Sequence, residues 1–364
     1  MALYNGQMDT AVLTEAYERF SSTGPEWGDD QLTNHGPMAA EVLVRRGHAE
    51  EVPSWVDSYL RRLDQLPAST SRITADNWRE AMGDGRRIGD WTAYFSDQVK
   101  EQPWRDVLVT WWPRLLPGIV AGATHGVIRT GHAVRTLLAE EEQSPAATRE
   151  LAHGLAFWAA RALQVPQADQ AAAAPAGQLD AAAALGSVPR IPDQAGTVAA
   201  RFGQLPRLSG WTGSLAALRA AADPDDARDL LAGLVDAATL RYLSDGYASP
   251  VLLVHTATAP NAVLHIFPAL PRELWAPSLS AVWAASAAIT ATYAPAYPAP
   301  GTAVLAPPDG PDAVADAVAD VVDRAAAHGD EHVIKFTDTA VDVYERTHEP
   351  AALAAAIRIT ELIG

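Results

Sequence analysis

The sequence contains no cysteine among its 364 residues. This absence excludes disulfide frameworks, thiolate zinc sites, iron–sulfur clusters and cysteine nucleophiles, and it favours the cytoplasm as the compartment. Basic residues are scarce as well, because 27 Lys and Arg stand against 44 Asp and Glu, which gives a formal net charge of −17. Such an acidic surface repels phosphate backbones, so we expect no nucleic-acid partner.

Several motifs of common enzymes are also missing. The chain has no Gly-x4-Gly-Lys phosphate loop, no Gly-x-Ser-x-Gly elbow and no His-Glu-x-x-His. The glycines of the GDGRRIG segment, 83–89, have the wrong spacing for a dinucleotide fingerprint, and no strand precedes them. His328 and Asp330 match two ligands of a facial triad, but they lie at an expected helix–helix junction. Asp330 there is better explained as a helix cap.

Long runs of strongly apolar residues are lacking too. Between Asp245 and Asp309 the only charged residues are Arg272 and Glu273, but the stretch is rich in Ala, Ser, Thr and Pro. A spanning helix needs about 20 strongly apolar residues, so we expect buried core helices and no membrane partner. The first 22 residues hold acidic side chains and no apolar core, so we expect no signal peptide.

The periodicity that is present is helical. Apolar residues recur at helical spacing in 9–20, 149–164, 225–243, 250–258, 260–267, 277–292, 311–328, 331–346 and 350–362. Pro113 and Pro117 interrupt the apolar run 104–140, and we predict a long helix from near Pro117 to Glu140. No alternating strand pattern occurs. We therefore predict an all-α fold, a single large helical domain with a helical or loop insert around 165–225, whose Ala-rich part, 165–195, is the expected linker.

Histidines lie at informative places in this pattern. His35 precedes an expected helix start at Pro37, and His255 lies deep in the low-charge stretch. His125 and His132 are seven residues apart in the predicted long helix, hence on one face and about 10.5 Å apart along its axis. Each histidine alone is more often a structural residue than a ligand, but buried polar groups need partners.

A second pair, His332 and Lys335, is three residues apart on one helix face. A buried lysine amine loses its proton more easily, and a neutral amine can react with carbon dioxide to give a carbamate. The carbamate is a carboxylate-like metal ligand. Several histidines on core helices together with this lysine are therefore able to close around one metal ion.

Four segments resemble the questin oxidase-like family: residues 34–41 (NHGPMAAE), 124–130 (THGVIRT), 254–258 (VHTAT) and 330–335 (DEHVIK). The resemblance implies a helical fold and an oxygenase that opens rings of aromatic polyketides, notably anthraquinones, with dioxygen. It also implies a mononuclear non-haem iron, Fe(II), held by histidines and a carboxylated lysine. NADPH belongs to an older description of the reaction as a Baeyer–Villiger oxidation, and the missing nucleotide fingerprint fits the metal version better.

Carried over by position, the resemblance assigns the metal ligands as His35, His125, His255, His332 and Lys335, the lysine as its carbamate. It differs at Arg129, where other members carry a second histidine four residues after the first. Arg129 shares a face with His125, and we expect it either to stabilise a phenolate or peroxide anion or to form an ion pair. His132 is expected to contact the substrate or to support the ligands, and direct binding of the metal by His132 stays open.

Two other functions remain open at this point. One is a zinc-dependent hydrolase or cyclase with the same ligands, and the other is a non-catalytic helical protein that binds a hydrophobic small molecule. Trp111, Trp112 and Trp158 are candidates for an aromatic pocket, although tryptophan is mostly core filler. The sequence leaves the exact substrate, the need for a reductant and the oligomeric state open.

Overall fold

The computed structural model describes residues 2–29, 31–140, 143–172, 176–299 and 310–364. Within these ranges helices dominate, and the strands are β1 (Glu26–Trp27) and β2 (Leu32–Thr33), an antiparallel pair. The predicted all-α fold is confirmed. The chain forms two compact units, Met1–Leu163 with Pro268–Pro271 and Gln164–Phe267 with Arg272–Gly364. The single large domain stays a prediction.

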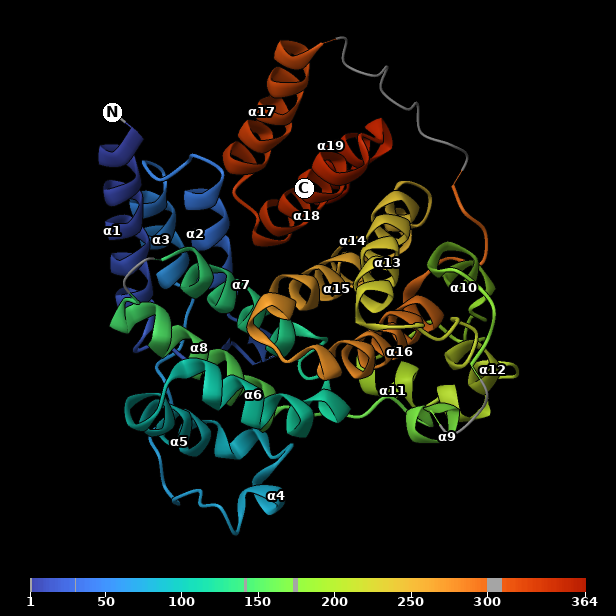
Figure 1. Cartoon of the computed structure of the whole chain (residues 1–364), viewed down its shortest axis with the longest axis horizontal. Coiled ribbons are helices and arrows are strands. Elements are labelled where there is room, and N and C mark those ends of the chain that lie inside the picture. The colour runs from blue at the N-terminus through green and yellow to red at the C-terminus, as the bar shows by residue number, and fades with distance from the viewer. Residues whose placement is uncertain (1, 30, 141–142, 173–175, 300–309) are drawn as a thin grey trace. The chain divides into compact units, whose positions relative to one another are not determined.

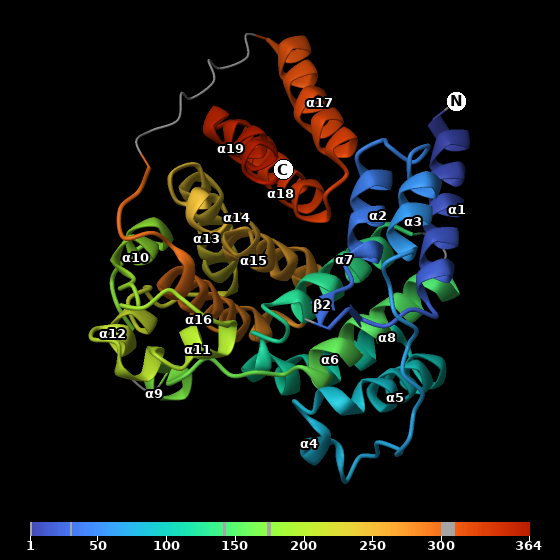
Figure 2. The same ribbon diagram turned by 180° about the vertical axis from the view of Figure 1, so that it is seen from behind.

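In the first unit, α8 and α2 each pack against several other helices. α8 packs against α5 and α7, and α2 packs against α1, α3 and α7. Figure 1 shows α1, α2 and α3 side by side, and Figure 2 shows α5, α6 and α8 together. Its helices are α1 (Ala2–Phe20), α2 (Gly36–Arg45), α3 (Val52–Leu60), α4 (Trp78–Ala81), α5 (Ile88–Glu101), α6 (Trp104–Leu115), α7 (His125–Ala139) and α8 (Pro145–Ala160), with 3₁₀ turns η1 (Gly85–Arg87) and η2 (Leu116–Gly118).

The core of this unit is rich in aromatic rings. Trp111, Trp112 and Trp158 are at most 1% exposed, and the rings of Trp112 and Trp158 meet edge to face with centroids 5.3 Å apart. Trp91 stacks on Phe95 at 5.6 Å. Edge-to-face and offset pairs of this kind stabilise a core beyond their buried area. The three tryptophans considered for a pocket are therefore buried core residues.

Two glycines let the helices of this unit approach closely. A Cβ at Gly36 would lie 2.4 Å from the Phe20 ring, and a Cβ at Gly126 would lie 2.7 Å from the Trp158 backbone. Each glycine directly follows a histidine, His35 or His125. The absent side chains thus seat the beginnings of α2 and α7 against α1 and α8.

The second unit is arranged around α13 and α15, which pack against each other, while α16 packs on both. The C-terminal helices α17, α18 and α19 pack together, as Figure 1 shows. The elements are α9 (Ala168–Ala172), α10 (Ala181–Ser187), α11 (Val198–Phe202), η3 (Leu205–Arg207), α12 (Trp211–Leu215), α13 (Pro224–Asp245), η4 (Gly246–Ala248), α14 (Pro250–Leu253), α15 (His255–Ile266), η5 (Phe267–Ala269), η6 (Arg272–Leu274), α16 (Trp275–Tyr293), α17 (Pro311–His328), α18 (Glu331–Thr347) and α19 (Pro350–Leu362).

Two stretches of the described chain are long and apolar enough to cross a membrane by length and composition, Pro250–Ala269 and Arg272–Tyr293. In each, 72% of the tested window is buried inside the structure. Core helices of globular proteins pass the same test, and this degree of burial is typical of them. The two stretches are therefore weak evidence for a membrane span.

The predicted long helix from Pro117 to Glu140 is wrong at its start, because α7 begins only at His125. Gly122, Ala123 and Thr124 all have positive φ, of 52°, 56° and 72°. Three successive left-handed residues cannot continue a right-handed helix. The chain therefore makes a tight turn directly before His125.

The predicted helices 250–258 and 260–267 are also wrong in their boundary. α14 ends at Leu253 and α15 runs through Pro260. A proline inside a helix leaves the carbonyl four residues earlier without its usual donor. Here the Ser286 hydroxyl donates to the Thr256 carbonyl at 3.4 Å, which supplies a replacement.

Candidate metal and acid–base site

His35 lies at the N-cap position of α2 and is 4% exposed. Its backbone N–H donates to the Tyr59 hydroxyl at 2.8 Å. The neighbouring Asn34 amide accepts from the Gly36 N–H at 2.9 Å and donates to the Gly24 carbonyl at 2.9 Å. These bonds hold the start of α2, so the position of His35 is set by the contacts to Tyr59 and Gly24.

His125 is the first residue of α7, and the strained turn before it orients the His125 ring. The turn brings the Gly122 carbonyl onto Nδ1 of His125. A carbonyl only accepts, so Nδ1 carries the proton, and the Nε2 lone pair of the neutral ring is exposed to a partner. Backbone strain that orients a functional side chain is typical of ligand sites.

The rings of His35 and His125 form a close pair inside the first unit. Their Nε2 atoms are 2.6 Å apart, and the rings stack with centroids 4.4 Å apart. Both are among the histidines of the described chain whose ring nitrogens are able to hold a metal ion. At this separation one nitrogen is able to donate a hydrogen bond to the other, and both are candidate metal donors.

The second unit carries two further histidines at the starts of α15 and α18. His255 is 1% exposed, and its Nδ1 donates to the Leu252 carbonyl at 3.2 Å. His332 Nδ1 lies 3.3 Å from the Asp330 carboxylate. The ring centroids of His255 and His332 are 6.2 Å apart. In both rings the acceptor at Nδ1 leaves Nε2 as the outward nitrogen. Metal-binding histidines are usually oriented by such an acceptor at the other ring nitrogen.

Asp330 confirms the predicted helix cap. Its carboxylate accepts from the backbone N–H groups of His332 and Val333 at 2.8 and 3.3 Å. Burial alone raises the pKa of Asp330, but its bonds to His332 and Val333 outweigh burial and lower the pKa to about 2. The other member of the supposed triad, His328, places Nε2 2.6 Å from the Ile363 carbonyl.

Lys335 is 2% exposed, one turn after His332 on α18. Within the described ranges its Nζ has no hydrogen bond or ion pair. Burial lowers its pKa to about 8, although the charges of Glu331 and Asp330 act in the opposite direction. A buried, easily deprotonated amine is the form that reacts with carbon dioxide. The same surroundings hold the pKa of His255 well below its usual value, first by burial and then by the charges of Lys335 and His332.

The four candidate ligand histidines share one placement, because each lies at the N-terminal end of a helix. A helix N-terminus carries about half a positive charge, which disfavours an imidazolium and favours the neutral ring. Neutral imidazole is the form that binds metals. Among the four, His255 has a pKa held well below its usual value, first by burial, so its ring is in that form.

The two predicted catalytic residues lie farther along α7, where each contacts a buried carboxylate. Arg129 is 2% exposed and holds Glu150 through two bonds, of 2.5 and 2.8 Å. This is the ion pair considered for Arg129, and its direct role toward a substrate anion stays a prediction. His132 Nδ1 contacts Glu41 at 2.8 Å.

The two carboxylates and Arg135 had no assigned role in the sequence analysis. Glu41 lies in the segment 34–41 that carries the family resemblance, so its place in that motif could have marked it as a candidate functional residue. It follows His35 by six residues, as His132 follows His125 by seven. Seven residues are about two helical turns, so His132 lies on the same face of α7 as His125, whereas six residues are only about 1.7 turns and the spacing does not place Glu41 on the face of His35.

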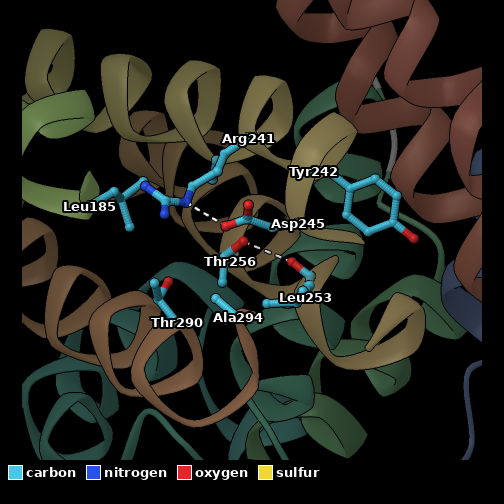
Figure 3. A pocket seen from close by; sticks show the side chains of 9 residues that line it. Leu185, Arg241, Tyr242, Asp245, Leu253, Thr256, Thr290 and Ala294 are labelled. Carbon is cyan, nitrogen blue, oxygen red and sulfur yellow. Dashed lines mark hydrogen bonds and ion pairs between the residues drawn. The ribbon is translucent and has the colours of Figure 1, made fainter. Parts of the chain in front are cut away.

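Two hollows, one in each unit, are lined by residues other than the candidate ligands and catalytic residues. Figure 3 shows one in the second unit, beside the Arg241–Asp245 ion pair and lined also by Thr256 and Thr290. Its volume of about 10 Å³ holds roughly one water molecule. A cleft of about 400 Å³ in the first unit is lined by Tyr94, Asp97 and their neighbours.

A comparison with protein families matches the model described as Questin oxidase-like to residues 39–339. The match covers most of the chain and includes His125, His255, His332 and Lys335, whereas His35 lies four residues before it. It supports an oxygenase-type function on aromatic polyketides. No curated protein matches the chain.

Proposed function

The chain belongs to the questin oxidase-like family, and from this premise we propose that it is a non-haem iron oxygenase that opens a ring of an anthraquinone-like polyketide. The observation that carries the proposal is a hydrogen-bond pattern that three histidines have in common. His125, His255 and His332 each have an oxygen acceptor at Nδ1, which leaves Nε2 for a metal.

The donor chemistry of the chain fits iron. We propose that His35, His125, His255 and His332 bind through imidazole nitrogen and that Lys335 binds as its carbamate. Imidazole and carboxylate-type ligands with an open position suit a non-haem iron centre that uses dioxygen. When bound, the iron supplies the redox chemistry between dioxygen and the aromatic ring.

The chain's own residues perform the remaining tasks. The carbonyls of Gly122 and Leu252 accept from Nδ1 of His125 and His255 and hold both rings in the binding tautomer. Burial of Lys335 favours the neutral amine, which with carbon dioxide gives the carbamate and releases one proton. His132 takes or returns a proton of the substrate.

The first test is metal content by mass spectrometry on untagged protein. We expect about one iron per chain, with loss of the iron in His35→Ala and in Lys335→Ala. His328→Gln is the matched control, because His328 lies at the exposed end of α17 and bonds a backbone carbonyl. One zinc per chain would favour the hydrolase or cyclase instead. No metal after anaerobic reconstitution with iron(II) would favour a binding protein.

The second test is oxygen uptake with anthraquinones under ¹⁸O₂, with and without NADPH. Two labelled oxygen atoms in the opened product indicate a dioxygenase. One labelled atom in the product, one in water and a requirement for NADPH indicate the Baeyer–Villiger reaction. No uptake by iron-loaded protein with any anthraquinone would contradict the proposed substrate class.

A further inference from the structure

The cleft of about 400 Å³ in the first unit lies between α5 and the segment 61–77, which joins α3 to α4. Figures 1 and 2 show this segment running past α5. The volume is in the range of sites that take small organic molecules. None of the candidate metal ligands lines the cleft, and neither of the two predicted catalytic residues does. A molecule bound in it therefore does not touch those residues.

The wall that the segment forms is held by the buried carboxylate of Asp90 on α5. Asp90 is 2% exposed and accepts from the Ser69 hydroxyl at 2.8 Å. The backbone N–H groups of Thr70 and Ser71 donate to it at 2.6 and 2.8 Å. Arg87 donates to the same carboxylate and, at 2.9 Å, to the Ser71 carbonyl. Burial alone raises the pKa of Asp90, but these bonds outweigh burial and lower it, so the carboxylate is ionised and Arg87 neutralises it.

The backbone of the segment is also fixed on either side of these bonds. A Cβ at Gly89 of α5 would lie 2.3 Å from the Pro67 carbonyl oxygen, so the missing side chain lets the segment reach the helix. Asn77 accepts from the Thr74 N–H at 2.8 Å and donates to the Arg72 carbonyl at 3.1 Å. The protein's own contacts therefore form this wall.

The opposite wall is one face of α5, whose residues recur there at intervals of three and four: Tyr94, Asp97, Gln98 and Glu101. The Tyr94 ring packs edge to face on the buried Trp111, with ring centroids 5.5 Å apart. Burial raises the pKa of Tyr94, although the charge of Arg114 and a hydrogen bond with Trp111 act in the opposite direction. Tyr94 is therefore a neutral phenol that offers an apolar surface in the cleft.

The remaining charges on the two walls have opposite signs. Arg72 lies on the segment, whereas Asp97 and Glu101 lie on α5, and all three are exposed. Among the residues that the structure describes, no ion pair joins Arg72 to either carboxylate. Asp97 contacts Lys100 at 3.6 Å, but the two side chains are 64% and 73% exposed, so this pair is weak. A ligand that complements both walls carries a negative and a positive group.

We propose that this cleft binds a small zwitterion, with its carboxylate on Arg72 and its ammonium group on Glu101 and Asp97. A guanidinium recognises a carboxylate through two parallel hydrogen bonds, and a carboxylate accepts from an ammonium group. The apolar body of the ligand packs on the Tyr94 ring. An amino acid or a short peptide with an aromatic side chain has this chemistry. The inference goes beyond the proposed function, because it depends neither on iron nor on an aromatic polyketide.

The test is a ligand-observed nuclear magnetic resonance titration of the whole protein. The probes L-phenylalanine and glycyl-L-phenylalanine carry both charges at two spacings, and we expect at least one to bind with a Kd on the order of 1 mM. Phenethylamine lacks the carboxylate and 3-phenylpropionate lacks the ammonium group. Each should bind about threefold to tenfold more weakly than the better zwitterion. Because the pairs are partly exposed, added NaCl should weaken binding of the zwitterion.

Two substitutions assign the ends of the ligand. Arg72→Gln should weaken the zwitterion and 3-phenylpropionate and leave phenethylamine unchanged. Glu101→Gln should weaken the zwitterion and phenethylamine and leave 3-phenylpropionate unchanged. Arg105→Gln and Glu50→Gln are the matched controls, because both residues are exposed in the first unit and do not line the cleft. All four variants change exposed side chains, so we expect them to fold.

Three results would overturn the inference: no saturable binding of either zwitterion in the millimolar range, analogues with one charge that bind as tightly as the zwitterions, or equal losses in the controls. Metal-free protein is expected to bind the zwitterion as tightly as iron-loaded protein, because no candidate metal ligand lines the cleft. Binding that requires the metal would place the ligand elsewhere. The titration therefore decides this inference whether or not the iron proposal holds.

Discussion

Arg129 and Arg135 of the first unit each contact a buried carboxylate, whereas Lys335 of the second unit is buried with no ion pair among the described residues. The consequence is chemical. A guanidinium held by two bonds stays charged and unreactive, and it keeps its neighbours in place. An isolated buried amine is costly to charge and easily deprotonated. The buried cations of the first unit thus orient their carboxylate partners, whereas the buried amine of the second unit is easily deprotonated.

The strongest way to break this contrast is to unpair a charge in the first unit. Arg129→Met leaves Glu150 buried without its partner and is expected to lower the free energy of unfolding by about 3–5 kcal/mol. The double variant Arg129→Met/Glu150→Leu should recover most of the loss. Arg161→Met, at the partly exposed pair with Glu26, should cost only about 1 kcal/mol. Urea unfolding of the metal-free proteins measures all three, and equal losses in both single variants would contradict the contrast.

Removing the unpaired charge of the second unit should have the opposite sign. The pKa of Lys335 is about 8 in the folded protein, against an ordinary value of 10.5. The unfolded chain therefore binds more protons between these values, and the stability of metal-free, carbon dioxide-free protein rises with pH across this window. Relative to wild type, Lys335→Met is stabilised below pH 8 by on the order of 3 kcal/mol, and the difference disappears by about pH 10.5. A variant less stable than wild type at pH 7 would show that the ammonium has a partner.

The smallest expected effect on stability comes from removing the N-cap residue Asp330, and a comparison with the N-cap Asp223 tests whether Asp330 also orients a metal ligand. Asp330→Ala and Asp223→Ala each remove an N-cap, from α18 and α13, and each should cost about 1 kcal/mol of stability. Asp330 also contacts His332 Nδ1, so its loss alone is expected to weaken iron binding about 10–100-fold. Titration with iron(II) under anaerobic conditions measures this, and equal affinities in both variants would remove Asp330 from the ligand support.

Local sequence signals predicted the parts of the site that depend on nearby residues. The start of α2 after His35 follows from Pro37, and the cap at Asp330 follows from its position before α18. Both depend on backbone groups within a few residues, which sequence reports directly. The start of α7 could not be predicted in this way. Its turn is left-handed at Ala123 and Thr124, residue types that give no sign of positive φ.

The hydrogen-bond partners of the buried polar side chains could not be predicted from the sequence either. Glu41 and His132 are 91 residues apart, and nothing near either one indicates the other. Only the packing of α2 against α7 brings them together.

The sequence by itself determined the helical class, the family and the histidines and lysine that we propose as metal ligands, because periodicity, spacing and motif are local properties. The tertiary structure decided which nitrogen each ring presents and which charges are neutralised. Those outcomes depend on helix packing, burial and the direction of single carbonyl and carboxylate groups, which arise only when distant segments meet in the fold.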